Sequence, residues 1–176
     1  MVRSEPRLGR SHHEGRKRVK PERVTFAQVV EASGQERDAL IRRLVEGMSL
    51  KEKIDQMTGC DRFLRLAVQA VRYNKYTFNS GKNRRRGILP IRFTDGPSGV
   101  CLGRSTCFPV AIARGASWDP ELQERVSEAI GIEARAQGAN FYGGVCINVL
   151  RHLGWGRAQE TFGEDPYHLG VMGVAA

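Results

Sequence analysis

Apolar side chains recur at helical spacing in the segment that begins at Glu36. These positions are Leu40, Ile41, Leu44, Val45 and Met48. The stripe predicts an amphipathic helix, which we expect to be the first ordered element of the chain.

The next stretch, SLKEKIDQMTG, carries the signals of a second, shorter helix. Ser49 stands three residues before Glu52, a capping box in which each side chain accepts from the other residue's free backbone N–H. Gly59 supplies a stop. A third helix is expected over FLRLAVQAVRYN, and the glycine-bounded SGKNRRRG is expected to form an exposed loop.

The pattern changes to β-prone at ILPIRFTDGPSGV. Ile91–Thr94 is a short apolar run that stops at Asp95, and DGPSG is turn chemistry. Another apolar run, FPVAIA, follows. Asp119 is then a good N-cap with Pro120 at the first helical position, and Gly138 closes the helix. The expected buried stripe of this helix is Leu122, Val126, Ala129 and Ile130.

The last part of the chain repeats the order of strand, loop and helix. VCINVL is a further strand candidate, and Asp165 with Pro166 caps a helix that we expect to be still running at Ala176. This alternation predicts an α/β fold with a parallel sheet. Ligands of such folds collect where strands end, which places Asp95 at one candidate position and the loop from Asn148 to Arg157 at another.

The positive charge is concentrated in two places. Residues 1–24 carry a net +5 and GKNRRRG adds four more, which together account for the whole net charge of +9. The first of these lacks apolar runs, so we interpret residues 1–35 as a basic, disordered tail and residues 36–176 as the folded part. No stretch has the apolar length of a secretory signal or a membrane span, so a cytoplasmic protein is the default expectation.

The cysteines and histidines do not predict a metal site or a cofactor. The four cysteines form no CxxC pair, and His152 and His168 stand apart from them. We therefore expect no metal, no cofactor, and free, mostly buried thiols.

Two side chains are candidates for ligand binding, and each also has a plain structural interpretation. Asp95 could simply bond its own turn, or it could accept hydrogen bonds from sugar or polyol hydroxyls. Arg157 could be a surface residue paired with Glu160. Beside it, however, Trp155 could line a pocket wall, and a guanidinium offers five fixed donors. Asp165 is assigned to the helix cap.

Five stretches in a fixed order carry a resemblance. They are MSLKEKIDQM, IRFTDGPSGV, TCFPVAIARGASWDPEL, EAIGIEARAQGAN and GWGRAQETFGEDPYHLG. Together they resemble the N-terminal half of a family 3 glycoside hydrolase, a group that includes many β-glucosidases. The resemblance implies part of a (β/α)8 barrel and retaining hydrolysis of terminal, non-reducing β-linked sugars. It also implies that Asp95 and Arg157 bind the sugar, with Glu160 as support for Arg157 and Trp155 beside it.

The sequence departs from the family pattern in three ways. RHLGWGR replaces a stretch that often reads RDPRWGR, and Cys101 replaces an arginine for which Arg104 is the possible substitute. The third departure is length, because a full barrel needs about 250 residues. The resemblance therefore implies a truncated chain whose catalytic nucleophile and acid/base lie outside these residues, so that it is inactive alone.

Two alternatives belong to other classes of protein. The basic tail and KNRRRG could form a nucleic-acid-binding module, but they lack the interleaved aromatic side chains of single-strand binders. The resemblance implies a carbohydrate partner. A non-catalytic sugar-binding remnant is the other alternative. An incomplete barrel would also expose sheet edges and apolar helix faces, and self-association is expected.

Overall fold

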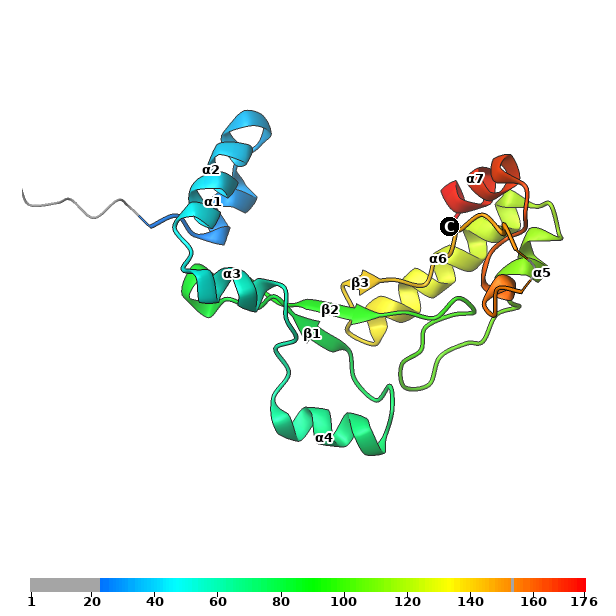
Figure 1. The fold of residues 1–176 in the computed structure, drawn as a ribbon, viewed down its shortest axis with the longest axis horizontal. Coiled ribbons are helices and arrows are strands. Elements are labelled where there is room, and N and C mark those ends of the chain that lie inside the picture. The colour runs from blue at the N-terminus through cyan, green and yellow to red at the C-terminus, as the bar shows by residue number, and fades with distance from the viewer. Residues whose placement is uncertain (1–22, 153) are drawn as a thin grey trace, which may run out of the picture.

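The computed structural model describes residues 23–152 and 154–176. Helices α1–α7, strands β1–β3 and the 3-10 turns η1 and η2 follow one another along the chain (Figure 1). Their bounds are α1 Phe26–Glu31, α2 Gly34–Glu46, α3 Leu50–Gln56, α4 Phe63–Val71, β1 Phe78–Ser80, η1 Arg84–Arg86, β2 Ile91–Thr94, α5 Ala111–Gly115, α6 Pro120–Ala136, β3 Phe141–Tyr142, η2 Ala158–Glu160 and α7 Pro166–Val174.

A small mixed sheet joins the two ends of the molecule. The strand order is β1-β2-β3, with β1 antiparallel to β2 and β2 parallel to β3. Phe93 of β2 lies opposite Phe141 of β3, and their rings are 5.7 Å apart. The parallel pair is a βαβ unit, because α5 and α6 connect its strands, but its second strand, β3, is not the one predicted. The fold is therefore α/β, although the antiparallel β1 was not predicted.

The predicted helix caps are present. The Ser49 hydroxyl accepts from the backbone N–H of Glu52 at 3.2 Å, while the Glu52 carboxylate accepts from the N–H of Ser49 at 2.9 Å. Asp119 caps α6 through the N–H of Leu122 at 2.9 Å, and Asp165 caps α7 in the same way. These contacts are local, which explains why the sequence alone predicts them.

Two assignments in the second half of the chain are corrected. VCINVL is not a strand: within it only Cys146 makes a parallel bridge, to Thr161, and the strand beside β2 is instead β3. The run FPVAIA contains the start of α5. The buried face of α6 also differs from prediction, because Leu122 is exposed while Gln123 is almost fully buried.

The predicted boundary of the tail at residue 35 is also wrong. Helix α1 lies inside the range expected to be disordered, and α2 starts at Gly34. The reason is an apolar cluster that the tail interpretation overlooked. Its buried members are Val24, Val29, Leu44 and Met48. Residues 1–22, the most basic part of the predicted tail, lie outside the described residues.

The basic stretch GKNRRRG is only partly the exposed loop that was expected. Arg86 is 4% exposed, and its guanidinium donates to the carbonyl oxygens of Val24 and Gly47. Arg85 forms an ion pair with Glu52 of α3. Two of the basic side chains counted toward a nucleic-acid surface are therefore engaged in contacts within the protein.

Among residues 23–152 and 154–176, the buried apolar side chains form three separate clusters rather than one core. One joins α1 and α2, a second packs α6 against the segment after β2, and a third packs α5 against α7. Figure 1 shows α1 and α2 at one end of the molecule and α5 and α7 at the other, with the sheet between them. No helix within residues 23–152 and 154–176 is long and apolar enough to cross a membrane. All four cysteines are free, as expected, but Cys101 and Cys107 are exposed rather than buried.

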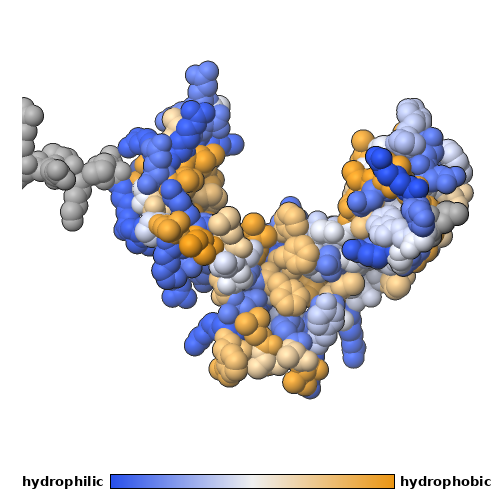
Figure 2. Space-filling model, in the orientation of Figure 1, coloured by the Kyte–Doolittle hydropathy of each residue, from blue (hydrophilic) through white to orange (hydrophobic). Residues whose placement is uncertain are grey.

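Helix α4 leaves a large apolar surface uncovered, which leads to a first prediction. Phe63, Leu64 and Val71 are all highly exposed, and apolar atoms gather over α4 in Figure 2. We expect the chain to self-associate at micromolar concentration, because contiguous apolar patches bind one another in water. Light scattering after size exclusion should show a mass above the monomer's 19.6 kDa.

Replacing Phe63 and Leu64 with serine should lower that mass, whereas the exposed control Lys53→Ser should not. A monodisperse monomer in the unmodified chain would contradict the expectation.

Candidate functional site

Asp95 lies where β2 ends, at the start of a turn built by glycines. The backbone N–H of Cys101 donates to the backbone carbonyl of Asp95 at 2.9 Å. Gly96 and Gly99 adopt φ values of 125° and 129°, which side chains rarely tolerate. A β-carbon at Gly96 would also collide with the carbonyl oxygen of Gly99. The conformation of the turn therefore depends on these glycines.

The carboxylate of Asp95 is free to bind something else. It is exposed, and within the described part of the chain it accepts no hydrogen bond. The plain turn interpretation required the side chain to bond its own backbone, but here the main chain closes the turn. A carboxylate at a strand end that is not used by the fold can accept hydrogen bonds from a ligand.

Arg157 is held in a fixed plane by Glu160. The Arg157 Nε donates to Glu160 Oε1 at 2.8 Å, and Nη2 donates to Oε2 of the same carboxylate. The side chain of Glu160 is 15% exposed and that of Arg157 is 65% exposed. The fork of this pair therefore uses one edge of the guanidinium and leaves its other N–H groups facing solvent.

The ion pair also keeps both groups charged. The hydrogen bond from Arg157 lowers the pKa of the Glu160 carboxyl, and the same bond and charge raise the pKa of Arg157. The negative charge of Asp95 also raises the pKa of Arg157, as the smallest of these contributions. Glu160 is thus the direct partner of Arg157, as their spacing predicts.

Cys146, four residues after the end of β3, contacts this ion pair. Its Sγ donates to Glu160 Oε2 at 3.7 Å, and its backbone bridges to Thr161. Burial raises the pKa of the Cys146 thiol, and the charge of Glu160 raises it further. The thiol therefore stays protonated and can act as the weak donor that this contact needs.

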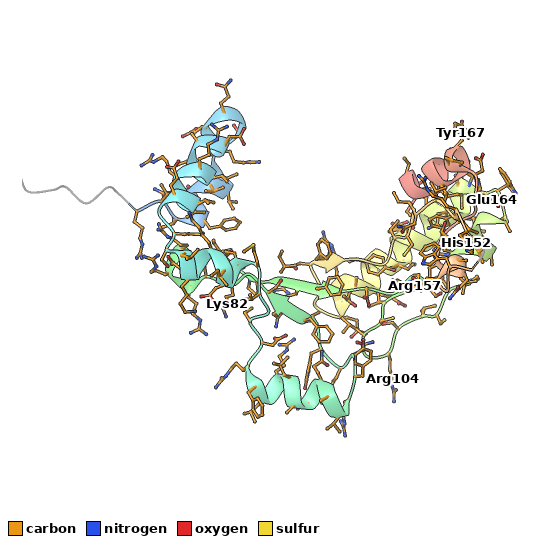
Figure 3. All side chains as sticks on the ribbon, viewed as in Figure 1. Lys82, Arg104, His152, Arg157, Glu164 and Tyr167 are labelled. Carbon is orange, nitrogen blue, oxygen red and sulfur yellow. The ribbon has the colours of Figure 1, made fainter. Side chains whose placement is uncertain are left out.

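The other predicted residues are less directly involved. Trp155 is half-buried in the turn before η2, and its backbone N–H donates to His152. Asp165 is the helix cap, as expected. Figure 3 shows His152 and Arg157 in the same region and Arg104 well apart from Arg157. The backbone carbonyl of Arg104 accepts from Gln137 Nε2. That the Arg104 side chain substitutes for the family arginine stays a prediction.

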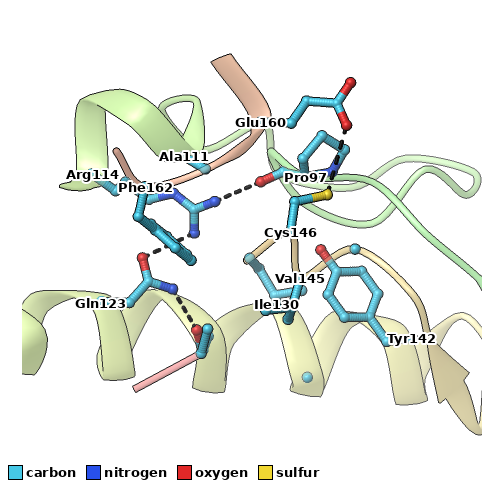
Figure 4. A pocket seen from close by; sticks show the side chains of 14 residues that line it. Pro97, Ala111, Arg114, Gln123, Ile130, Tyr142, Val145, Cys146, Glu160 and Phe162 are labelled. Carbon is cyan, nitrogen blue, oxygen red and sulfur yellow. Dashed lines mark hydrogen bonds between the residues drawn. The ribbon is translucent and has the colours of Figure 1, made fainter. Parts of the chain in front are cut away.

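A cavity of about 120 Å³ lies beside Glu160 and Cys146. Its lining includes Arg114, Gln123 and Tyr142 (Figure 4). Sequence reasoning missed these three, because Gln123 lies within a predicted helix and Arg114 and Tyr142 belong to none of the predicted elements. The available signal was a charged arginine within AIARGASW, a stretch that offers it no local carboxylate.

The family model described as "Glycosyl hydrolase family 3 N terminal domain" matches residues 39–176 of the chain. The chain belongs to glycosyl hydrolase family 3. The resemblance of the five sequence stretches is thereby confirmed, and the match supports the hydrolase interpretation over the nucleic-acid alternative.

Two relatives within the family carry names of different sugars. A Beta-glucosidase of Rhizobium radiobacter is 34% identical over 143 residues, which are 77% of this chain and 16% of the relative. A Beta-xylosidase of Formosa agariphila is 30% identical over 155 residues, which are 85% of this chain and 19% of the relative. The chain thus spans less than a fifth of these family 3 relatives.

A solved Beta-glucosidase structure shares the fold. The Beta-glucosidase of Kluyveromyces marxianus, determined in complex with glucose, has a TM-score of 0.61 and 26% identity. The matched region covers 77% of this chain and 15% of that one. The mixed helix and strand arrangement is therefore that of family 3 enzymes.

Proposed function

We propose that these residues form the part of a β-glucosidase-type catalytic domain that binds the terminal, non-reducing sugar. The observation that carries the proposal is the family match over residues 39–176 together with the uncommitted Asp95 carboxylate at a strand end. The longer protein would hydrolyse terminal β-linked sugars with retention.

The proposed architecture is the first part of a (β/α)8 barrel. The parallel pair β2 and β3, joined through α6, is one βα repeat of the kind that barrels multiply. Asp95 stands at the carboxyl end of its strand, the face where barrel enzymes bind ligands. The fold shared with the glucose-bound relative supports this placement.

Asp95 and Arg157 offer complementary chemistry to a sugar. The ionised carboxylate accepts hydrogen bonds from hydroxyls, whereas the guanidinium donates them in a fixed plane. Glu160 orients Arg157 and neutralises part of its charge. Trp155 is half-buried and precedes Arg157 by two residues, so its ring is proposed to contribute apolar contact area to the sugar.

Hydrolysis needs two further carboxyl groups. Retaining glycosidases place a nucleophile and an acid/base about 5 Å apart. We assign neither role within this chain, since Asp95 is proposed as a sugar ligand and Glu160 is bound to Arg157. The chain alone is expected to bind sugar without turnover of a chromogenic β-glucoside.

The Asp95→Asn variant should lose glucose binding. Removing the charge weakens hydrogen bonds to hydroxyls, so the dissociation constant should rise roughly tenfold or more. A two-dimensional NMR titration of the 176-residue chain with D-glucose measures this directly. Asp38→Asn, on the exposed surface of α2, makes the same change in charge and should bind like the unmodified chain.

Equal affinity in the two variants would exclude Asp95 as a ligand. Absence of glucose binding in the unmodified chain would count against the whole proposal. A parallel titration with D-xylose separates glucosidase from xylosidase preference. Binding without turnover by a longer protein containing the remaining barrel would favour the non-catalytic alternative.

A further inference from the structure

Two side chains from different elements donate to consecutive backbone carbonyls directly after Asp95. The hydroxyl of Tyr142, in β3, donates to the carbonyl oxygen of Gly96. The Nη2 of Arg114, in α5, donates to that of Pro97 at 2.5 Å. Asp95, Gly96 and Pro97 follow one another in the chain. The two bonds therefore restrain the peptide units on which the position of the Asp95 side chain depends.

Arg114 is itself fixed from other sides. Its Nη1 donates to Gln123 Oε1 at 3.2 Å, and Gln123 Nε2 donates to Ser127 at 2.7 Å (Figure 4). The guanidinium also lies 5.5 Å from the centre of the Phe162 ring. Arg114 is therefore a rigid connection between α6 and the loop.

Burying the charged side chain of Arg114 costs free energy, whereas burying an apolar side chain at this position would not. The side chain is 7% exposed, its Nε has no partner among the described residues, and burial lowers its pKa. Its two hydrogen bonds go to a carbonyl and an amide, so no carboxylate compensates the charge. A leucine would fill such a position at lower cost but could not hold a carbonyl.

The side chain of Tyr142 is also fixed by its surroundings. Burial raises its pKa to about 12, so the phenol stays protonated and able to donate at neutral pH. Gly144 approaches so closely that a β-carbon there would collide with the Tyr142 hydroxyl. The backbone after β3 therefore confines the phenol to its position against Gly96.

We propose that Arg114 and Tyr142 are positioning residues that hold the loop after Asp95 and thereby set where its carboxylate meets the sugar. The inference rests on the proposed sugar-binding role of Asp95. Neither residue needs to touch the sugar itself. Small displacements of such a ligand weaken binding strongly, because productive geometry is narrow.

The Tyr142→Phe variant tests the proposal with little change in shape, because it removes only the hydroxyl. The backbone N–H of Cys101, which donates to Asp95, should exchange with solvent about three- to tenfold faster in the variant. The N–H of Leu169 in α7 should keep its rate. Glucose affinity of the 176-residue chain should fall by a similar factor.

Tyr167→Phe is the matched control, because Tyr167 is highly exposed on α7. It should change neither measurement. Arg114→Met should act in the same direction as Tyr142→Phe, and the phenylalanine variant keeps the test available if Arg114→Met does not fold.

The two readouts separate the possible failures. Unchanged exchange at Cys101 in Tyr142→Phe would overturn the claim that the loop is held. Faster exchange with unchanged glucose affinity would overturn the positioning role and leave a purely structural one. If the unmodified chain does not bind glucose, the proposed function fails, and with it the positioning role; the exchange rates then still decide whether the loop is held.

Discussion

The Gly115→Ala variant is expected to lose about 3 kcal/mol of its free energy of unfolding, the upper end of the range for overpacking. A β-carbon at Gly115 would collide with the carbonyl oxygen of Phe162 and would lie 2.9 Å from its Cα. Both atoms belong to the backbone, so no side-chain rotation relieves the clash. The ring Nε2 of His168 also lies 3.0 Å from the Gly115 carbonyl.

This close approach joins α5 to the segment after η2, beside the cluster that packs α5 against α7. Urea denaturation followed by tryptophan fluorescence measures the loss, because Trp118 lies 4.1 Å from the His168 ring. Gly131→Ala is the control: a β-carbon there meets nothing within 4 Å. In the middle of α6 it should stabilise by about 0.5–1 kcal/mol. Equal stability of the two variants would contradict the packing argument.

The Arg86→Ala variant should destabilise the chain by about 2–4 kcal/mol, because it leaves buried carbonyls without donors. Arg86 Nη1 donates to Val24 at 3.3 Å, and Nη2 donates to Gly47. These bonds attach the first two helices to the 3-10 turn η1. Their loss should therefore weaken the N-terminal cluster more than the helices α5 to α7.

Arg84→Ala provides a control two residues away. Arg84 belongs to the same turn but is exposed, so its removal should change stability by less than about 0.5 kcal/mol. Thermal unfolding followed by circular dichroism compares the two variants. If both have the same midpoint, the buried guanidinium is not a structural tie.

Features set by short-range chemistry could be predicted from the sequence. The capping box of Ser49 and Glu52, the caps at Asp119 and Asp165, and the strand Ile91–Thr94 are all present. Each depends on residues within four positions of one another. Local propensity and spacing were therefore sufficient.

Features set by distant partners could not be predicted in this way. VCINVL has the composition of a strand, but within it only Cys146 bridges to another segment, and the strand that pairs with β2 is Phe141–Tyr142. The three arginines of GKNRRRG look equivalent in sequence, yet only Arg86 meets carbonyls from the N-terminal helices. Tertiary contacts decide both cases.

The candidate site divides along the same line. The pairing of Arg157 with Glu160 followed from their spacing, and the roles of Asp95 and Arg157 came from the family resemblance. The contacts from Tyr142 and Arg114 to the loop span 46 and 17 residues. No periodicity or motif in one sequence encodes such pairs.

The parallel pairing of β2 with β3 has a consequence for the order of folding. Phe93 and Phe141 meet only after the intervening chain, including α6, has been brought into a closed loop. Contacts this far apart in sequence form slowly, because the entropy of closure precedes any gain from pairing. Tyr142 reaches the Asp95 loop through that same event. The ligand-binding geometry should therefore be among the last features acquired during folding, after the helices and the β1–β2 hairpin.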